Sequence, residues 1–238
     1  MILVRLSDEM LLLTVQSPPG NLLDKQDITA LLEQTERAAT DPKIRGILLT
    51  GHGNCFVTGV DLQQIGQEPD GIEKFFELFE TLLYKLFTLS KPIVAAVNGH
   101  SIGGGLLLQC CAGWVCMAEN PKIKVGLPEV GLGLTIDSFM HILLRYCSVS
   151  DKHLASMLLG GRYLSAKEAS DAGFADAVVP AQDLLTQTKK QLDNMQGKPF
   201  EAFAQTKRQA HTVTTALLAE AIQNKSYRIF NSFLVKNI

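Results

Sequence analysis

The order of hydrophobic and polar positions predicts a chain in which strands and helices alternate. Two short apolar runs, residues 2–6 and 11–15, are separated by three polar residues and predict a β-hairpin. Apolar side chains then recur at helical spacing over residues 24–39, which predicts an amphipathic helix with Asp24 as its N-cap. Residues 44–50 form a β-rich run that ends at a Gly-His-Gly turn, so they predict a further strand.

The middle of the chain continues this alternation. Residues 71–90 have the spacing of a long amphipathic helix, and residues 92–97 form a compact apolar run that predicts a buried strand. The glycines at 103–105 open the next expected helix, and residues 114–117 predict another strand. This order of strands and helices favours an α/β core.

Beyond Pro128 the pattern becomes mostly helical. Ser165 and Glu168 have the spacing of a capping box, which predicts a helix start at this point. The last part of the chain has helical patterns separated by a Gly-Lys-Pro break. We therefore expect an α/β core over residues 1–182 and a helical C-terminal region over residues 183–238.

The composition is that of a soluble globular protein, with 46% hydrophobic and 19% charged residues. The net charge of −2 and the lack of a long basic segment give no sign of a nucleic-acid partner. The five cysteines do not follow a Cys/His spacing typical of zinc sites, so we expect reduced thiols and no metal site.

The apolar segments also bear on location. The longest of them, residues 106–118, is broken by Gln109 and is too short to cross a bilayer, so no membrane partner is expected. The first residues lack an apolar segment followed by a small-residue cleavage site, which is the pattern of an export signal. We expect the protein to be cytoplasmic.

Three segments carry the candidate chemistry, and they span residues 54–62, 95–107 and 125–133. In the second segment, a predicted strand runs into the glycines at 103–105, where a helix start leaves backbone N–H groups without helical partners. Such groups can bind a phosphate or an oxyanion that develops during a reaction. Alone, the glycines fit close packing of a helix on a strand equally well, and their spacing matches neither a Walker loop nor a dinucleotide fingerprint.

In combination and in this order, the segments resemble the crotonase (enoyl-CoA hydratase/isomerase) family. The motifs that carry the resemblance are Gly-Val-Asp, Asn-Gly-His-Ser-Ile-Gly-Gly-Gly and Gly-Leu-Pro-Glu, and the similarity runs along nearly the whole chain. It implies an α/β fold of the ClpP-like type, a spiral of ββα units over residues 1–182 followed by a helical region for oligomerisation over residues 183–238. It also implies an acyl-coenzyme A thioester as substrate, no separate cofactor, and a homotrimer or a hexamer made of two trimers.

The resemblance also implies residue roles. Matching the motifs puts the two N–H groups of an oxyanion hole on Val60 and Gly104. Family members usually carry a small residue at the Val60 position, so this side chain is expected to narrow the site. The substrate contacts implied by the same match are Asp61, Gly103, Gly105, Leu107 and Lys236.

The carboxylates decide which reaction is expected. Hydratases of the family resemble one another in having two glutamates that hold and activate water, and here the first position is Leu107 while the second matches Glu129. One carboxylate in an apolar pocket suits a proton transfer between two carbons. This pattern is similar to that of the mitochondrial-type Δ3,Δ2-enoyl-CoA isomerases. It implies that Glu129 helps to convert a 3-enoyl-CoA into a 2-enoyl-CoA through a dienolate held by the oxyanion hole.

Asp137 leaves two interpretations open. It lies eight positions beyond Glu129, and dienoyl-CoA isomerases of the family have a catalytic aspartate at this spacing. It also precedes an expected helix at residues 138–147, where an aspartate is a common N-cap. The alternative functions are therefore a dienoyl-CoA isomerase that uses Asp137, an enoyl-CoA hydratase, a decarboxylase, and a non-catalytic homologue.

Overall fold

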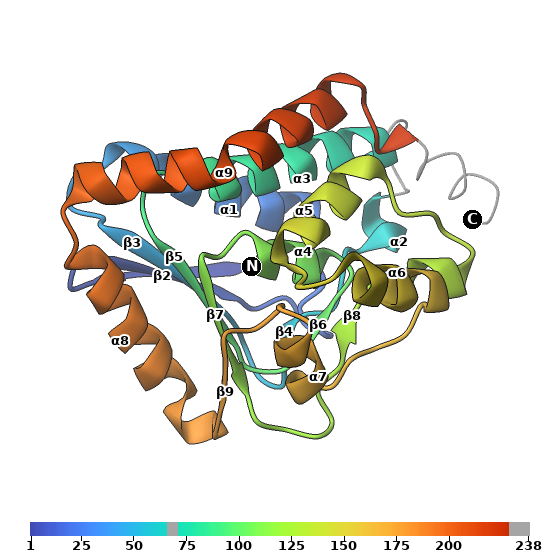
Figure 1. Ribbon diagram of the computed structural model, residues 1–238, viewed down its shortest axis with the longest axis horizontal. Helices are drawn as coiled ribbons and strands as arrows, with labels where there is room; N and C mark the ends of the chain where they lie inside the picture. Colours follow the sequence, from blue (N-terminus) through green and yellow to red (C-terminus); the bar gives the residue numbers. More distant parts are fainter. Residues whose placement is uncertain (66–70, 229–238) are drawn as a thin grey trace.

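The chain forms one large sheet and one small sheet with helices around them, as the computed structural model in Figure 1 shows. The structure describes residues 1–65 and 71–228. In chain order its elements are β1 (Ile2–Ser7), β2 (Met10–Val15), α1 (Lys25–Thr40), β3 (Gly46–Gly51), β4 (Cys55–Val57), α2 (Leu62–Ile65), α3 (Gly71–Thr88), β5 (Ile93–Val97), β6 (His100–Ile102), α4 (Gly104–Cys110), β7 (Trp114–Ala118), β8 (Val125–Gly126), η1 (Glu129–Leu132), α5 (Ser138–Cys147), α6 (Asp151–Gly160), α7 (Ala166–Asp171), β9 (Ala177–Val179), η2 (Ala181–Asp183), α8 (Leu184–Gln196) and α9 (Phe200–Gln223).

The large sheet has the strand order β1-β2-β3-β5-β7-β9. The strands β1 and β2 form the expected antiparallel hairpin, with Ile2 opposite Val15, and the other neighbours are parallel. Every residue of β5 is buried, as is usual for a parallel strand covered on both faces. The prediction of a buried strand at this position is therefore confirmed.

The small sheet has the order β4-β6-β8 and was not predicted from the sequence. Each of its strands follows a strand of the large sheet, since β4 comes after β3, β6 after β5 and β8 after β7. A helix then follows each pair, which gives the repeated ββα units that were expected. The small-sheet strands have only two or three residues each, too few for an apolar period to be recognised.

The helices cover the sheets as the patterns predicted, with two local corrections. Asp24 caps α1 by accepting a hydrogen bond from the N–H of Asp27 at 2.7 Å, and Ser165 and Glu168 form the expected capping box of α7. The strand β9 lies in a part of the chain that was expected to be mostly helical. The segment 24–39 forms a helix as predicted, but that helix begins at Lys25 and ends at Thr40.

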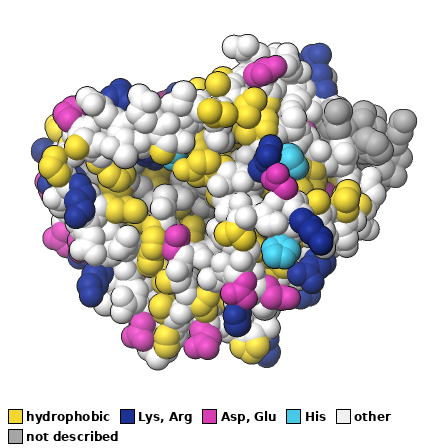
Figure 2. Space-filling view, in the orientation of Figure 1, with side chains coloured by type: hydrophobic (Ala, Val, Ile, Leu, Met, Phe, Trp, Pro, Cys, Tyr) yellow, Lys and Arg dark blue, Asp and Glu magenta, His cyan; other side chains and the backbone are white. Residues whose placement is uncertain are grey.

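The C-terminal helices lie on two sides of the molecule. Helix α8 packs on the strands β3, β5 and β7, whereas α9 runs across α3 and α5 (Figure 1). The domain boundary after residue 182 stays a prediction. Within the described residues, no helix has the length and hydropathy needed to cross a membrane. Over the described part of the face drawn in Figure 2, acidic, basic and hydrophobic side chains are interspersed.

Candidate active site

The glycine loop lies where β6 ends and α4 begins. Gly103 has φ of +55°, a conformation that residues with a side chain rarely adopt, and its N–H donates to the carbonyl oxygen of Gly126 at 2.9 Å. A Cβ atom on Gly105 would lie only 2.1 Å from the carbonyl oxygen of Val57. Gly105 thus has no room for a side chain, because α4 packs directly on β4.

Two backbone N–H groups are left free at this loop. Gly104 is the first residue of α4, so its N–H has no acceptor within the helix. Leu23 donates to Gly59 at 3.0 Å and accepts from Asp61 at 2.9 Å, which pairs the neighbours of Val60 and leaves the Val60 N–H outside the pairing. Within residues 1–65 and 71–228, neither of these two N–H groups has a hydrogen-bond acceptor.

Val60 and Gly104 are also neighbours in space. A Cβ atom on Gly104 would lie 3.2 Å from Cγ1 of Val60. Both residues line the same cavity of about 150 Å³. The apolar side chains of this cavity come from Val60, Leu62, Phe76, Phe79, Ile102, Leu107, Pro128, Leu132, Leu134 and Met140.

Glu129 supplies the acidic side chain of this cavity. It begins the 3-10 helix η1 after Pro128, and a Cβ atom on Gly103 would lie 3.2 Å from its Oε1. Its Oε2 is buried and has no hydrogen-bond partner among the described residues. Burial raises the pKa of the Glu129 carboxyl to about 7. Near neutral pH this carboxyl can therefore both accept and donate a proton.

Leu107 faces the same cavity from α4, one turn after Gly104. It is buried, with 1% of its surface exposed. Of the residues described as lining the cavity, Glu129 is the only one with a carboxyl group. The cavity thus combines free N–H groups, one carboxyl of raised pKa and an apolar wall.

The comparisons with known proteins identify the family of the chain. A family model described as enoyl-CoA hydratase/isomerase matches residues 6–237. The chain belongs to this family. The three sequence motifs predicted membership of the crotonase family, and this prediction is confirmed.

Relatives with different activities are similar to this enoyl-CoA hydratase/isomerase family member. Mouse "Enoyl-CoA delta isomerase 1, mitochondrial" is 27% identical over 225 residues, which are 94% of this chain and 77% of that protein. The "2,3-dehydroadipyl-CoA hydratase" of Escherichia coli K12 is 30% identical over 211 residues, which are 88% of this chain and 80% of that protein.

Solved structures of the crotonase fold superpose on this chain. The human mitochondrial delta3-delta2-enoyl-CoA isomerase superposes with a TM-score of 0.88 at 24% identity, over 96% of this chain and 91% of that one. An enoyl-CoA hydratase/isomerase from Pseudoalteromonas atlantica gives a TM-score of 0.85 at 27% identity, over 98% of this chain and 91% of that one. The expected α/β fold, a spiral of ββα units followed by helices, is confirmed.

The other predicted contact residues of this family member are placed as follows. Asp61 lies outside the cavity lining, and its Oδ1 accepts from the N–H of Gln64 at 3.0 Å, so its carboxyl caps the short helix α2. Lys236 lies outside the described residues. The roles of Val60, Gly103, Gly104, Leu107 and Glu129 in binding or catalysis stay predictions, although all five line one cavity.

Asp137 is the N-cap of α5, which confirms the capping interpretation. Its Oδ1 accepts from the N–H of Met140 at 2.8 Å, and the residue is 2% exposed. Burial raises the pKa of its carboxyl to about 6. Asp137 is not among the cavity-lining residues, whereas Met140 is. Its carboxyl therefore lies next to the cavity wall but outside the cavity.

Glu80 is a buried acid that the sequence analysis missed. It lies on α3, one helical turn after Phe76, and accepts from Oγ of Ser226 at 3.3 Å. Burial, and then the nearby charge of Asp137, raises the pKa of its carboxyl to about 8. Its place on the apolar face of a predicted helix was the signal that could have identified it.

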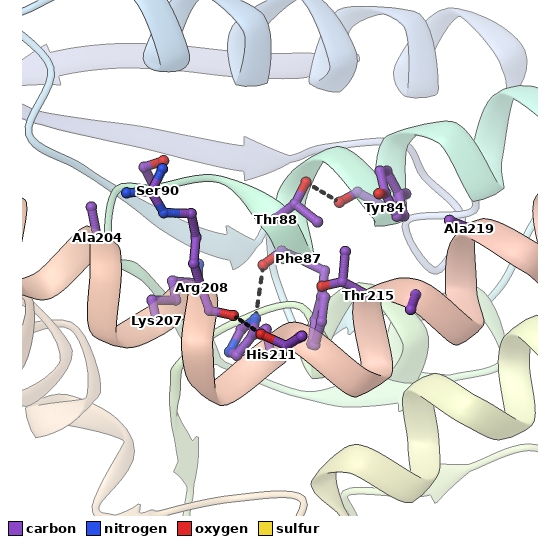
Figure 3. Close-up of a pocket in the computed structure, with 12 residues that line it drawn as sticks. Tyr84, Phe87, Thr88, Ser90, Ala204, Lys207, Arg208, His211, Thr215 and Ala219 are labelled. Carbon is purple, nitrogen blue, oxygen red and sulfur yellow. Dashed lines mark hydrogen bonds between the residues drawn. The ribbon is translucent and has the colours of Figure 1, made fainter.

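A larger groove lies between α3 and α9, as Figure 3 shows. It has a volume of about 440 Å³, and none of its described lining residues is acidic. Lys207 donates from Nζ to the carbonyl oxygen of Leu89 at 2.8 Å, and burial lowers the pKa of this lysine to about 8. The ring of His211 stacks on Phe87 with the centroids 4.2 Å apart. None of the motif residues lines this groove.

Proposed function

We propose that this chain is an enoyl-CoA isomerase that converts a 3-enoyl-CoA into a 2-enoyl-CoA. One observation carries the proposal: a single carboxyl group, that of Glu129, shares a cavity with two free N–H groups. Leu107 lines the same cavity at the position where related hydratases have their first glutamate. The similarity to the mouse and human enoyl-CoA isomerases supports the same reaction.

In this proposal the thioester oxygen accepts hydrogen bonds from the N–H groups of Val60 and Gly104. Loss of a proton from C2 moves negative charge onto that oxygen, and donors already in place stabilise the charge without reorganisation. Removal of one such donor typically costs about 3–4 kcal/mol of transition-state stabilisation. The two N–H groups should therefore matter at least as much as the base.

Glu129 is the proposed base and acid. Its carboxylate takes the proton from C2, and the electrons of the C2–H bond form C1=C2 while the carbonyl π electrons move onto the thioester oxygen, which gives the dienolate. When the carbonyl re-forms, the C1=C2 electrons form the C2=C3 double bond and the electrons of the former C3=C4 bond take the proton back at C4. The same carboxyl group is thus regenerated in each cycle. A pKa of about 7 suits this double role, because general acid–base catalysis works best when the pKa lies near the working pH.

The apolar wall favours isomerisation over hydration. Hydration requires a water molecule that is oriented and activated, whereas Leu107 offers no polar atom for that purpose. An apolar wall also protects the dienolate from protonation by solvent. Hydration is the alternative reaction within the family, because the similar E. coli protein is named as a hydratase. A dienoyl-CoA isomerase would need Asp137 as a second acid or base, whereas this carboxyl caps α5 through Oδ1 and does not line the cavity.

The proposal extends to assembly, location and cofactors. A homotrimer or a dimer of trimers and turnover without any added cofactor follow from the family resemblance, and a cytoplasmic location is part of the same proposal. Light scattering of the purified protein tests the assembly. Dialysis against a chelator tests the last point, and activity should be unchanged.

Replacement of Glu129 tests the reaction, with Asp137 as a matched buried acid. Glu129→Gln should lower the rate of 3-enoyl-CoA isomerisation by about 10²–10⁴-fold, the usual contribution of a general base. Binding of a saturated acyl-CoA should change little. Asp137→Asn should be close to the unmodified protein, since asparagine caps a helix about as well as aspartate.

Each variant has an outcome that contradicts the proposal. Full activity of Glu129→Gln would remove Glu129 from the chemistry. A large loss of rate in Asp137→Asn at an unchanged melting temperature, together with turnover of a 3,5-dienoyl-CoA by the unmodified protein, would favour the dienoyl-CoA isomerase instead.

A further inference from the structure

The cavity beside the glycine loop has an open side and a closed side. Leu132 is 67% exposed and marks the mouth, whereas Phe76, Phe79 and Met140 are at most 5% exposed and form the inner wall. An acyl chain that enters past Leu132 therefore ends against aromatic side chains of α3 and against α5.

Phe79 lies directly against the glycine loop. Its Cζ and Cε1 atoms would lie 3.2 and 3.3 Å from a Cβ atom on Gly104. The ring thus fills the space immediately inside the residue whose N–H is proposed to hold the thioester oxygen. Little room is left between that N–H and the inner wall.

The wall is a packed layer rather than one movable ring. The ring centroid of Phe75 is 6.1 Å from that of Phe79 and 5.5 Å from that of Phe76, in tilted and edge-to-face arrangements. All three side chains are at most 2% exposed. Displacement of Phe79 would therefore disturb a close-packed cluster, which costs free energy.

Polar groups lie next to this wall. The carboxylate of Asp137 accepts a hydrogen bond from the N–H of Met140, and Glu80 directly follows Phe79 in α3. Each of the two acids has a buried carboxyl oxygen without a hydrogen-bond partner among the described residues. An alkyl chain that passed the aromatic layer would meet these carboxyl groups and remove them further from water, which is unfavourable.

The volume of the cavity limits the length of the acyl chain that it can hold. A cavity of about 150 Å³ lined by Leu, Ile and Phe holds a ligand of the size of benzene, with roughly six carbon atoms. The cavity here has the same volume and a similar lining. On the basis of the proposed function, we infer that the site takes short acyl chains of up to about six carbon atoms and that Phe79 sets this limit.

Binding of saturated acyl-CoA thioesters of four, six, eight and ten carbons tests the limit without any turnover. Each added methylene that enters an apolar site should tighten binding by about fourfold. The unmodified protein should show this gain up to six carbons and no gain beyond. Isomerisation of 3-enoyl-CoA substrates of the same lengths should give the highest kcat/KM at four or six carbons.

Phe79→Ala should move the limit, and Phe75→Ala is its matched control. Both replace a buried phenylalanine of the same cluster, but only Phe79 lines the cavity. Phe79→Ala should extend the gain in affinity to eight carbons, by about 15-fold for the two added methylenes. Phe75→Ala should leave the preferred length unchanged. If either alanine variant fails to fold, the corresponding Leu variants carry the same comparison.

The outcomes separate this inference from the proposed function. Binding and turnover of ten-carbon thioesters as good as those of six-carbon ones would overturn the length limit while leaving the isomerase proposal intact. A binding limit at six carbons without isomerisation of any length would support the limit and contradict the isomerase. An equal shift in Phe75→Ala and Phe79→Ala would overturn the role of Phe79.

Discussion

Two hollows border helix α3, and they differ in size and in chemistry. The smaller, about 150 Å³, lies beside the glycine loop and contains the carboxyl of Glu129. The larger, about 440 Å³, lies between α3 and α9 and contains the ammonium group of Lys207 but no acidic lining residue among those described. Burial raises the pKa of the Glu129 carboxyl to about 7 and lowers the pKa of the Lys207 ammonium group to about 8, so both values lie near neutrality.

The difference lies in what surrounds each buried group. Glu129 has an unpartnered carboxyl oxygen and shares its cavity with the free N–H groups of Val60 and Gly104. Lys207 donates to the carbonyl oxygen of Leu89 and helps to join α9 to the end of α3. A shifted pKa alone therefore does not identify a catalytic group, because buried structural contacts produce the same shift. The two free N–H groups distinguish the smaller cavity.

Of the variants that compare the two hollows, we expect the largest loss of rate from one that crowds the carboxyl of Glu129. In Gly103→Ala the new Cβ would lie 3.2 Å from Oε1 of Glu129, so the carboxyl must move. The required shift is a few tenths of an ångström, so we expect the isomerisation rate to fall by up to about 10²-fold, the loss that a misplacement of catalytic groups by about 1 Å causes. Gly133→Ala is the control, because Gly133 also has a positive φ, of +74°, but has open space around its Cβ position. Similar losses of rate in both variants would attribute the effect to backbone strain.

A second carboxyl group in the small cavity should change the reaction. Leu107→Glu should lower isomerisation by about tenfold, equivalent to ~1.4 kcal/mol of transition-state stabilisation, and introduce measurable hydration of a 2-enoyl-CoA. The size of the gain depends on how far the new buried acid ionises. Product analysis by chromatography follows both reactions. Leu108→Glu, at a neighbouring buried position outside the cavity lining, controls for the buried charge.

The pH profile compares the two buried groups directly. Glu129 must be ionised to accept a proton, so kcat/KM should rise by about tenfold per pH unit below a pH of about 7 and level off above it. Lys207→Met should leave this profile unchanged. A profile that flattened or moved in Lys207→Met would link the groove to the reaction and remove the distinction between the two hollows.

Of these variants, Lys207→Met should change the isomerisation rate least, but it should measurably change the pH dependence of stability. The folded protein holds the pKa of Lys207 at about 8, below the ordinary value of 10.5. Between these pH values the unfolded chain binds more protons, so Lys207 makes the free energy of unfolding increase as the pH rises from 8 to 10.5. In Lys207→Met this contribution should disappear. Urea unfolding at several pH values measures it, and an unchanged slope would contradict the assignment.

The sequence predicts local features of the fold well because these depend on nearby residues. The caps Asp24 and Asp137 lie directly before their helices, and a side chain that accepts from an N–H three residues later needs no distant partner. The buried strand β5 was recognisable as a compact apolar run. The small sheet was not, since its strands pair residues distant in sequence and are too short to show a period.

The candidate site was predictable only in part. The motifs pointed to Glu129 and Gly104, which do line one cavity. The proximity of Glu80 to Asp137 and the wall formed by Phe76 and Phe79 arise from the packing of α3 against α4 and α5, and single-sequence patterns contain no information about such contacts. The same holds for Lys207 of α9, whose pKa depends on its burial against the end of α3.

The central claim is that one carboxyl group facing an apolar wall moves a proton and does not activate water. The most direct measurement compares two initial rates for the unmodified protein with the same six-carbon acyl chain. One is the isomerisation of the 3-enoyl-CoA, and the other is the hydration of the 2-enoyl-CoA. We predict that isomerisation is faster by at least about 10²-fold, since loss of a general acid or base typically costs this much. Hydration as fast as isomerisation would contradict the account.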